Sequence, residues 1–266
     1  MLYLMTLLFI FIIGLAIGSF SNVLIDRLPN DESIMGRSHC DFCKKTLTAW
    51  ELIPILSFVI QKRRCRNCGK KLSFQYPIIE LWTGVLFLLT WIYIMGEISV
   101  GNITTVMPMF TVVAYIAVVS CLNIIFITDA KYQIIPDSMQ IALLVCSVLL
   151  LFSTGVLGAH PWMQVLAGIC TLAPILALHM VTRGRGMGFG DVKFAFIMGF
   201  LLGIGKGFLA LYIGFIVGAI VGVILMAFGT KKLKSKIAFG PFLVIGLMTM
   251  LVAGDQILMY VNYLYK

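Results

Sequence analysis

The chain has 266 residues, of which 61% are hydrophobic and only 12% are charged, and its formal net charge is +9. So few charged side chains cannot cover a water-soluble globule, and most of the surface is expected to face lipid. A net positive charge can also indicate nucleic acid binding. Here the distribution of the basic residues favours an orientation signal for a membrane protein instead, and no nucleic acid partner is expected.

Apolar runs near the length of about 20 residues that crosses a bilayer recur along the chain. They predict an all-α polytopic membrane protein with about eight transmembrane helices. The first run carries no charged residues before it and is long for the apolar part of a signal peptide, so we expect an uncleaved anchor. The sixth run is the shortest. The eight runs cover residues 2–24, 78–95, 104–127, 139–156, 163–181, 192–204, 208–228 and 239–261.

The only long polar segment divides the chain into three predicted parts: a first transmembrane helix (1–25), a small cytoplasmic domain (26–77) and a transmembrane core (78–266). Ten of the 20 Lys and Arg residues lie in the polar segment. With eight crossings, eight more fall on its side of the membrane. These are Lys131, Arg183, Arg185, Lys193, Lys231, Lys232, Lys234 and Lys236, whereas only Lys206 and Lys266 fall opposite. The positive-inside rule therefore places the polar segment in the cytoplasm and both termini outside.

Two CxxC pairs lie in this polar segment, CDFC at residues 40–43 and CRNC at residues 65–68. Four thiolates at this spacing can close a tetrahedral zinc site, with Gly69 giving the second turn backbone freedom. The alternatives are two disulfides or four unused thiols, and a reducing cytoplasm disfavours disulfides. Because four cysteines leave no open position, the zinc is expected to be structural and to help fold a segment of roughly 50 residues with little core of its own. The predicted ligands are Cys40, Cys43, Cys65 and Cys68.

Two aspartates stand out among the acidic residues. Asp129 follows the apolar run YIAVVSCLNIIFIT and so ends a helix, where the helix dipole disfavours a carboxylate. Asp191 lies in GMGFGDVK, residues 187–194, where it can cap the N-terminus of a helix. Capping does not require Gly188 and Gly190, which are expected to allow positive φ angles and the close approach of an extended peptide.

The topology places Asp129 and Asp191 at the same membrane depth, on the cytoplasmic side. Two carboxylates that share a site do not both ionise easily, so one can act as a base while the other donates a proton. Such a pair can activate water for attack on a peptide carbonyl without a covalent intermediate, which predicts a hydrated cleft around it. The alternative is two unrelated surface acids. The chain has no HExxH, GxSxG or P-loop motif, which argues against the corresponding enzymes.

Six blocks of sequence, taken together and in order, resemble the type IV prepilin peptidases, which are bifunctional membrane aspartyl proteases of the GxGD type. They are GSFSNVLIDRLP (18–29), RSHCDFCKKTLTAWELIPILSF (37–58), RCRNCGKKLSFQYPIIELWTG (64–84), ITDAKYQIIPD (127–137), GMGFGDVK (187–194) and AFGPFLVIG (238–246). A departure is Asp41, where the family commonly has proline within the first CxxC.

The resemblance implies an enzyme of the inner (plasma) membrane that cleaves basic leader peptides from type IV prepilins or pseudopilins at the cytoplasmic face. It also implies N-methylation of the new amino terminus from S-adenosylmethionine, although no donor-binding residue can be carried over. By the family motifs, Asp129 and Asp191 are catalytic and the four cysteines bind zinc. Two other hypotheses remain open from the residues. One is a transporter or channel in which Asp129, Asp191, Glu80 and Asp255 line an ion path. The other is a scaffold whose zinc segment recruits a partner.

Overall fold

The computed structural model describes residues 1–40, 42–101, 103, 105, 107–159, 161–184, 186–228 and 237–264. Asp41, Arg185, Lys266 and the four lysines of the 231–236 stretch therefore lie outside the described residues. The chain forms two compact units, Met1–Ile103 and Thr104–Lys266. This division is based on which residues pack together. The division predicted after residues 25 and 77 is based on the polarity of the sequence, and it stays a prediction.

The all-α fold class is confirmed, since the described residues form helices joined by turns and two isolated β-bridges. Each of the eight apolar runs falls largely within one helix. Six helices are long and apolar enough to cross a membrane: α1 (Leu2–Arg27), α3 (Gln75–Val100), α4 (Pro108–Tyr132), α7 (Pro161–Val181), α9 (Ile204–Ala227) and α10 (Gly240–Leu264). The other two, α5 (Asp137–Ser153) and α8 (Phe189–Leu202), have 17 and 14 residues. Because both are shorter than the roughly 20 residues typical of a membrane-spanning helix, the count of eight crossings stays a prediction.

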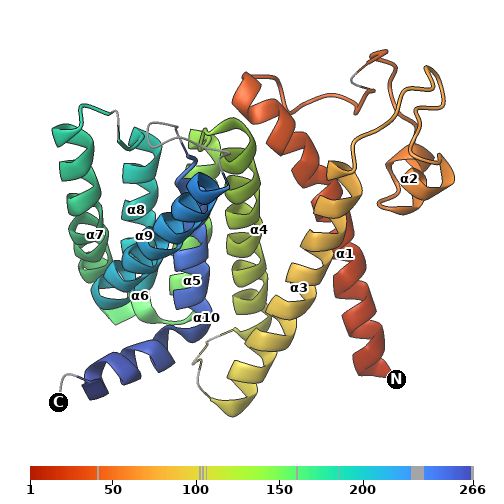
Figure 1. Ribbon diagram of the computed structural model, residues 1–266. Coiled ribbons are helices and arrows are strands. Elements are labelled where there is room, and N and C mark those ends of the chain that lie inside the picture. Colours follow the sequence, from red (N-terminus) through yellow and green to blue (C-terminus); the bar gives the residue numbers. More distant parts are fainter. Residues whose placement is uncertain are drawn as a thin grey trace. The chain divides into compact units, whose positions relative to one another are not determined.

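Four short elements complete the chain: η1 (Leu28–Asn30), η2 (Ala49–Leu52), α2 (Leu56–Ile60) and α6 (Val156–Ala159). The first three lie between α1 and α3, in the segment that also carries the four cysteines. Its long irregular stretches can be followed in Figure 1. The predicted small domain between the first two long helices is thus present as a segment with little regular structure.

Helices α1 and α3 of the first unit are in close contact because glycines face the partner backbone. A Cβ atom added at Gly14 would lie 2.7 Å from the Cα of Gly84, and one added at Gly18 would lie 2.8 Å from the Cα of Glu80. Small residues that let two backbones approach are typical of helix pairs in lipid, where packing replaces the hydrophobic effect. A hydrogen bond of 3.2 Å from Asn22 Nδ2 to the carbonyl of Tyr76 joins the same helices.

Glu80 is buried on α3 and accepts a hydrogen bond of 2.7 Å at Oε2 from the backbone N–H of Ile55. Ile55 has a positive φ of 60°, which is rare for a β-branched residue. The bond fixes this strained turn, which precedes α2, to the beginning of α3. The hydrogen bond to the polar segment therefore gives a structural reason for an acidic residue early in an apolar helix.

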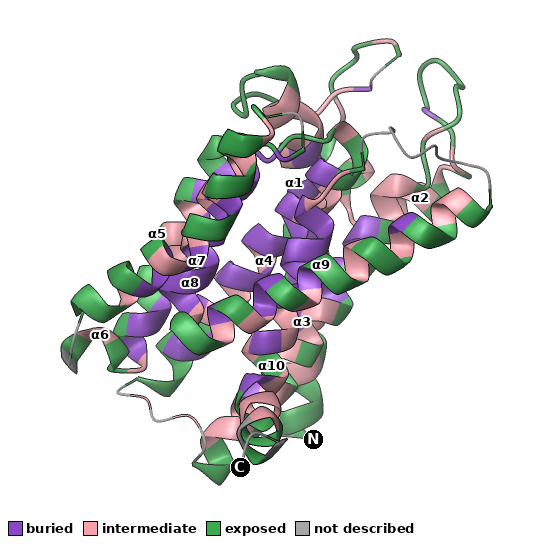
Figure 2. Cartoon of the chain, turned by 60° about the vertical axis from the view of Figure 1, so that its left-hand side comes forward, coloured by how far each residue is buried: buried purple, intermediate pink, exposed green. Residues whose placement is uncertain are grey.

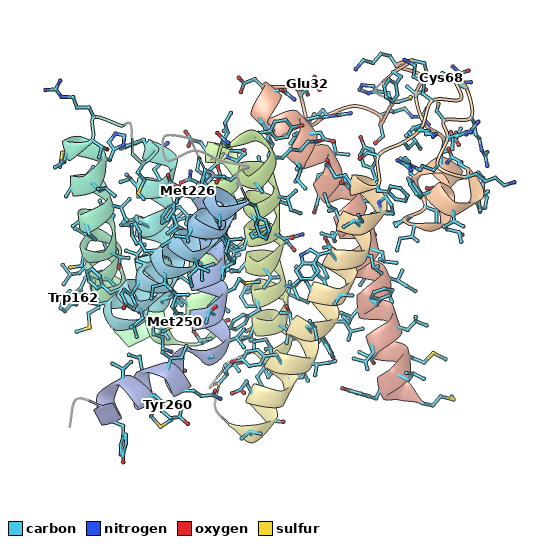
Figure 3. The ribbon with its side chains drawn as sticks, in the orientation of Figure 1. Glu32, Cys68, Trp162, Met226, Met250 and Tyr260 are labelled. Atoms are coloured by element: carbon cyan, nitrogen blue, oxygen red, sulfur yellow. The ribbon has the colours of Figure 1, made fainter. Side chains whose placement is uncertain are left out.

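The second unit packs α4, α5, α7, α8, α9 and α10 around a core of fully buried residues that includes Leu122, Leu143, Phe194 and Leu247. Figure 2 shows buried residues on the inner sides of these helices and exposed residues on their outer sides. Trp162 at the start of α7 is 58% exposed and Tyr260 near the end of α10 is 74% exposed, and both are labelled in Figure 3. Exposed aromatic residues near helix ends are typical of the border between lipid and water.

Candidate active site and candidate metal centre

The four cysteines of the first unit lie on two turns with the same hydrogen-bond pattern. In the first turn the N–H of Cys40 donates to the carbonyl of Lys45 over 3.0 Å, and the N–H of Lys44 donates to the carbonyl of Cys40 over 2.9 Å. Lys44 has a φ of 56°, a left-handed conformation that the sequence did not lead us to expect at a lysine.

The second turn repeats these contacts around Cys65. Its N–H donates to the carbonyl of Lys70 over 3.0 Å, and the N–H of Gly69 donates back to the carbonyl of Cys65 over 2.9 Å. Gly69 has a φ of 69°, so the prediction that it gives the second turn backbone freedom is confirmed, although Lys44 adopts the same conformation in the first turn.

The four predicted ligands meet at one point. The Sγ atoms of Cys40, Cys43, Cys65 and Cys68 all lie within 4.8 Å of one another, and those of Cys40 and Cys68 are 3.9 Å apart. A tetrahedral zinc ion with Zn–S bonds of about 2.3 Å separates its sulfur ligands by about 3.8 Å. The cluster therefore fits a four-coordinate metal ion. Cys68 is labelled in Figure 3, within the irregular segment between α1 and α3.

The surroundings of Cys43 favour the thiolate that binds metals. The backbone N–H of Lys45 and the side-chain amide of Asn67 together lower the pKa of the Cys43 thiol to about 6. Asn67 Nδ2 lies 3.5 Å from Cys43 Sγ, and its Oδ1 accepts a hydrogen bond of 3.3 Å from Lys45 Nζ. Asn67, inside the second CxxC, thus stabilises a thiolate of the first.

Asp129 lies at the C-terminal end of α4, as the sequence predicts, and its side chain is buried. The backbone N–H of Gly240 donates a hydrogen bond of 2.8 Å to its Oδ2. Gly240 is the first residue of α10, so the electropositive N-terminus of one helix compensates the unfavourable dipole of the other. A Cβ atom at residue 240 would lie only 2.6 Å from Asp129 Oδ2. This hydrogen bond stabilises the Asp129 carboxylate at a helix end whose dipole disfavours it.

Asp191 lies in the first turn of α8 and is likewise buried. The predicted position at the helix start is confirmed, although the N-cap residue is Gly188 rather than Asp191. The N–H of Gly188 donates a hydrogen bond of 3.0 Å to Asp191 Oδ2. The carboxylate therefore receives an otherwise unpaired N–H at the positive end of the helix.

The two aspartates lie at the same end of the second unit, where the C-terminus of α4 faces the N-termini of α5, α8 and α10. Asp129 is close enough to act electrostatically on Asp191. Only 5% of Asp129 and 8% of Asp191 are exposed. Within the described residues, neither side chain lines the open, hydrated cleft that the sequence predicts. Gly188, whose N–H bonds to Asp191, is itself exposed.

The explanation of Gly188 and Gly190 by positive φ angles is wrong. Gly188 has a φ of −72°, and Gly190 is part of the regular first turn of α8. The left-handed residues nearby are Arg183 and Gly184, with φ angles of 50° and 73°. The sequence also predicts that these glycines allow the close approach of an extended peptide. That prediction depends on the absence of side chains rather than on φ, and it stays a prediction.

Two further contacts support this end of the unit and were missed from the sequence. Lys193 on α8 forms an ion pair of 2.7 Å with Asp137 on α5. The Nδ1 atom of His179, at the end of α7, lies 2.8 Å from the carbonyl oxygen of Met187 and holds the turn that leads to Asp191. Gly240 could have been found, since it lies in the block AFGPFLVIG that carries part of the family resemblance.

Comparisons with known proteins place this chain among described families. Residues 12–94 match the Bacterial Peptidase A24 N-terminal domain, and residues 116–223 match the Type IV leader peptidase family. A prepilin leader peptidase/N-methyltransferase of Bacillus subtilis (strain 168) is 34% identical over 94% of this chain and 96% of its own length. A protein of the same name from Neisseria gonorrhoeae is 29% identical over 95% of this chain and 92% of its own length. One from Klebsiella pneumoniae is 32% identical over 73% of this chain and 84% of its own length. No solved structure gives a significant match.

Proposed function

Because the chain belongs to the type IV leader peptidase family, we propose that it cleaves the basic leader peptide from type IV prepilins or pseudopilins and then N-methylates the new amino terminus. The observation that supports the peptidase function is that Asp129 and Asp191 are both buried and lie at the same end of the second unit. Both fall inside the segment that matches the leader peptidase family. We assign the proteolytic chemistry to these two aspartates, and the orientation of their carboxyl groups to the glycines that bond to them.

In this mechanism one carboxylate takes a proton from water, whose oxygen attacks the carbonyl carbon of the scissile peptide bond. The other, protonated carboxyl donates its proton as the C–N bond breaks and the amine leaves. The N–H groups of Gly240 and Gly188 hold Oδ2 of Asp129 and Asp191 respectively. They orient the two carboxyl groups, so that proton transfer falls to the Oδ1 atoms. The turn at Gly188 and Gly190 admits the peptide.

The chemistry takes place at the cytoplasmic face of the inner (plasma) membrane. Basic residues near this end of the unit, such as Lys131, Arg183 and Lys193, support that orientation by the positive-inside rule. It puts both termini outside and the cysteine segment in the cytoplasm. The substrate's apolar helix would then lie in the bilayer while its basic leader stays in water.

The metal of the first unit is zinc in this proposal, held by Cys40, Cys43, Cys65 and Cys68. The sulfur spacing supports a closed, structural site, in which bound zinc supplies a cross-link rather than a reacting group. The methyl donor is S-adenosylmethionine, as in the family, and no residue is assigned to it.

Two acids that supported an ion path have structural partners of their own. Glu80 accepts the N–H of Ile55, and Asp255 forms an ion pair of 2.7 Å with Lys206. The scaffold hypothesis makes a different prediction from the peptidase hypothesis, since it expects substitution of Asp129 and Asp191 to leave function unchanged.

The test is cleavage of a purified prepilin by the detergent-solubilised chain, with Asp129→Asn and Asp191→Asn compared with Asp137→Asn. Asp137 lies at the same end of the unit but is exposed and paired with Lys193. We expect loss of cleavage in the first two variants and retention in the third, with zinc content unchanged in all. Normal cleavage by Asp129→Asn and Asp191→Asn would overturn the dyad. Methylation is measured separately, by transfer of a labelled methyl group from S-adenosylmethionine to a pre-cleaved substrate.

A further inference from the structure

Gln140, in the first turn of α5, is a buried side chain without hydrogen bonds. Only 3% of the residue is exposed. Neither Oε1 nor Nε2 has a partner among the described residues. Burying an amide without hydrogen bonds is unfavourable, and folded proteins satisfy most of their buried polar groups. A fully unpaired carboxamide is therefore expected to serve a ligand.

The unpaired amide lies against the segment that carries the second aspartate. A Cβ atom added at Gly190 would lie 3.6 Å from Gln140 Nε2 and 3.4 Å from Ile135 Cβ. Gly190 directly precedes Asp191, so the amide is beside the reacting end of the second unit. A Cβ atom at residue 190 would thus be in van der Waals contact with this amide.

A second unpaired group lies beside the other aspartate. Thr128 directly precedes Asp129, is fully buried, and its hydroxyl has no partner among the described residues. By contrast, the buried Ser147 further along α5 donates its hydroxyl to the carbonyl of Leu143 over 2.8 Å. Polar groups are thus left unpaired next to both aspartates, although single unpaired atoms also occur elsewhere in this unit, at Thr105 Oγ1 and Gln164 Oε1.

The chemistry of a carboxamide narrows the choice of ligand. It offers one acceptor and two donors without a net charge, which complements the C=O and N–H groups of an extended peptide. A recognition mode based on main-chain hydrogen bonds also suits an enzyme whose substrates differ in sequence. An uncharged side chain leaves the balance of charge between the two carboxyl groups undisturbed.

We propose that Gln140 binds the main chain of the substrate beside the scissile bond, with Nε2 donating to a peptide carbonyl and Oε1 accepting from a peptide N–H. This inference rests on the proposed function, since it assigns a substrate contact in the same site. It also gives Gly190 a reason: a side chain there would fill the space in which the peptide meets the amide.

The test replaces Gln140 by Met, which keeps the unbranched shape and removes both hydrogen-bonding groups, and measures prepilin cleavage with the purified full chain. Losing a contact made both in the bound substrate and in the transition state raises KM more than it lowers kcat. We expect KM to rise about tenfold, the size of effect of one or two hydrogen bonds. The Tm should stay equal or rise, because the variant no longer buries an unpaired amide.

Ser147→Ala is the matched control, because it also removes a buried polar group from α5 but leaves the site untouched, so its KM should match the wild type. Gln140→Leu is measured in parallel to separate the effect of side-chain shape. An unchanged KM in Gln140→Met overturns the inference, and so does a loss of activity that follows a lower Tm in both variants. If the wild type itself fails to cleave any prepilin, the proposed function fails instead, whatever Gln140 does.

Discussion

Gly240 and Asp129 are 111 positions apart, and the backbone N–H of the first donates a hydrogen bond of 2.8 Å to Oδ2 of the second. The contact joins the beginning of α10 to the end of α4. It places the negative end of one helix dipole, and the carboxylate that extends it, against the positive end of another. The position of Asp129 is therefore set by a helix that is distant in sequence.

Gly240→Ala is expected to lower kcat for prepilin cleavage at least tenfold, because the new Cβ would lie 2.6 Å from Asp129 Oδ2 and displace the carboxyl group. A misplaced reacting group of this kind commonly costs more than that in rate. Steady-state kinetics on the purified variant checks the prediction. The control is Gly205→Ala, whose Cβ meets its nearest neighbour, Leu258 Cδ2, at an ordinary 3.8 Å. Equal rates for the two variants would show that Asp129 does not need this fit.

Breaking the ion pair between Lys193 and Asp137 should have little effect. Both side chains are substantially exposed, so the pair is expected to contribute about 0–1 kcal/mol to stability. Lys193→Met, Asp137→Asn and the double variant should all cleave prepilin within about threefold of the wild-type rate. Thermal unfolding of the four proteins gives the coupling energy by a double-mutant cycle. A coupling well above 1 kcal/mol would mean that the pair is shielded from water in the bilayer.

Glu80→Gln should loosen the turn at Ile55. The Ile55 N–H would then donate to a neutral amide oxygen, or would face the NH₂ group of the amide and lose its acceptor. The bond is 2.7 Å long and its carboxylate is buried. Hydrogen bonds to a charged group contribute more than those to neutral ones. Amide hydrogen exchange should become at least tenfold faster at Ile55. Glu97→Gln, on the same helix, should leave that rate unchanged, and a response to both substitutions would point to a general loosening of α3.

Removing the metal is expected to unfold the interior of the cysteine segment. We expect one zinc per chain in the wild type and its loss on treatment with a chelator or in Cys68→Ser, since ligand loss removes a cross-link that such a small segment depends on. Limited proteolysis near residues 61–64 should then become faster. Cys170→Ser, which changes a cysteine on α7, should retain both the metal and the resistance. Resistance retained after complete loss of zinc would show that the segment folds without it.

The elements that could be predicted from the sequence are those fixed by local pattern. Apolar runs of sufficient length became helices because lipid requires every backbone group to be paired internally. The two CxxC turns could be predicted because each is determined by a few adjacent residues. The helix-end positions of Asp129 and Asp191 follow from the same local patterns.

What could not be predicted depends on contacts between distant segments. The N–H that holds Asp129 comes from Gly240, and nothing near residue 129 indicates it. The unpaired amide of Gln140 is visible only once α5 is packed against α8. The positive φ angles expected at Gly188 and Gly190 are wrong for a local reason. Helix α8 begins at Phe189, earlier than its apolar run, so that Gly190 is helical and Gly188 is the extended N-cap.

The contact between α1 and α3 has a consequence for chain entropy in the segment that they enclose. Gly14 and Gly18 bring the two helices together, and Asn22 bonds to the backbone of Tyr76 close to where the segment ends. The two ends of a long loop are thus already held near each other, so loop closure is accomplished by the helices. The metal has only to order the interior of a loop that is already closed. Cysteine variants should therefore still insert α1 and α3 as a paired hairpin.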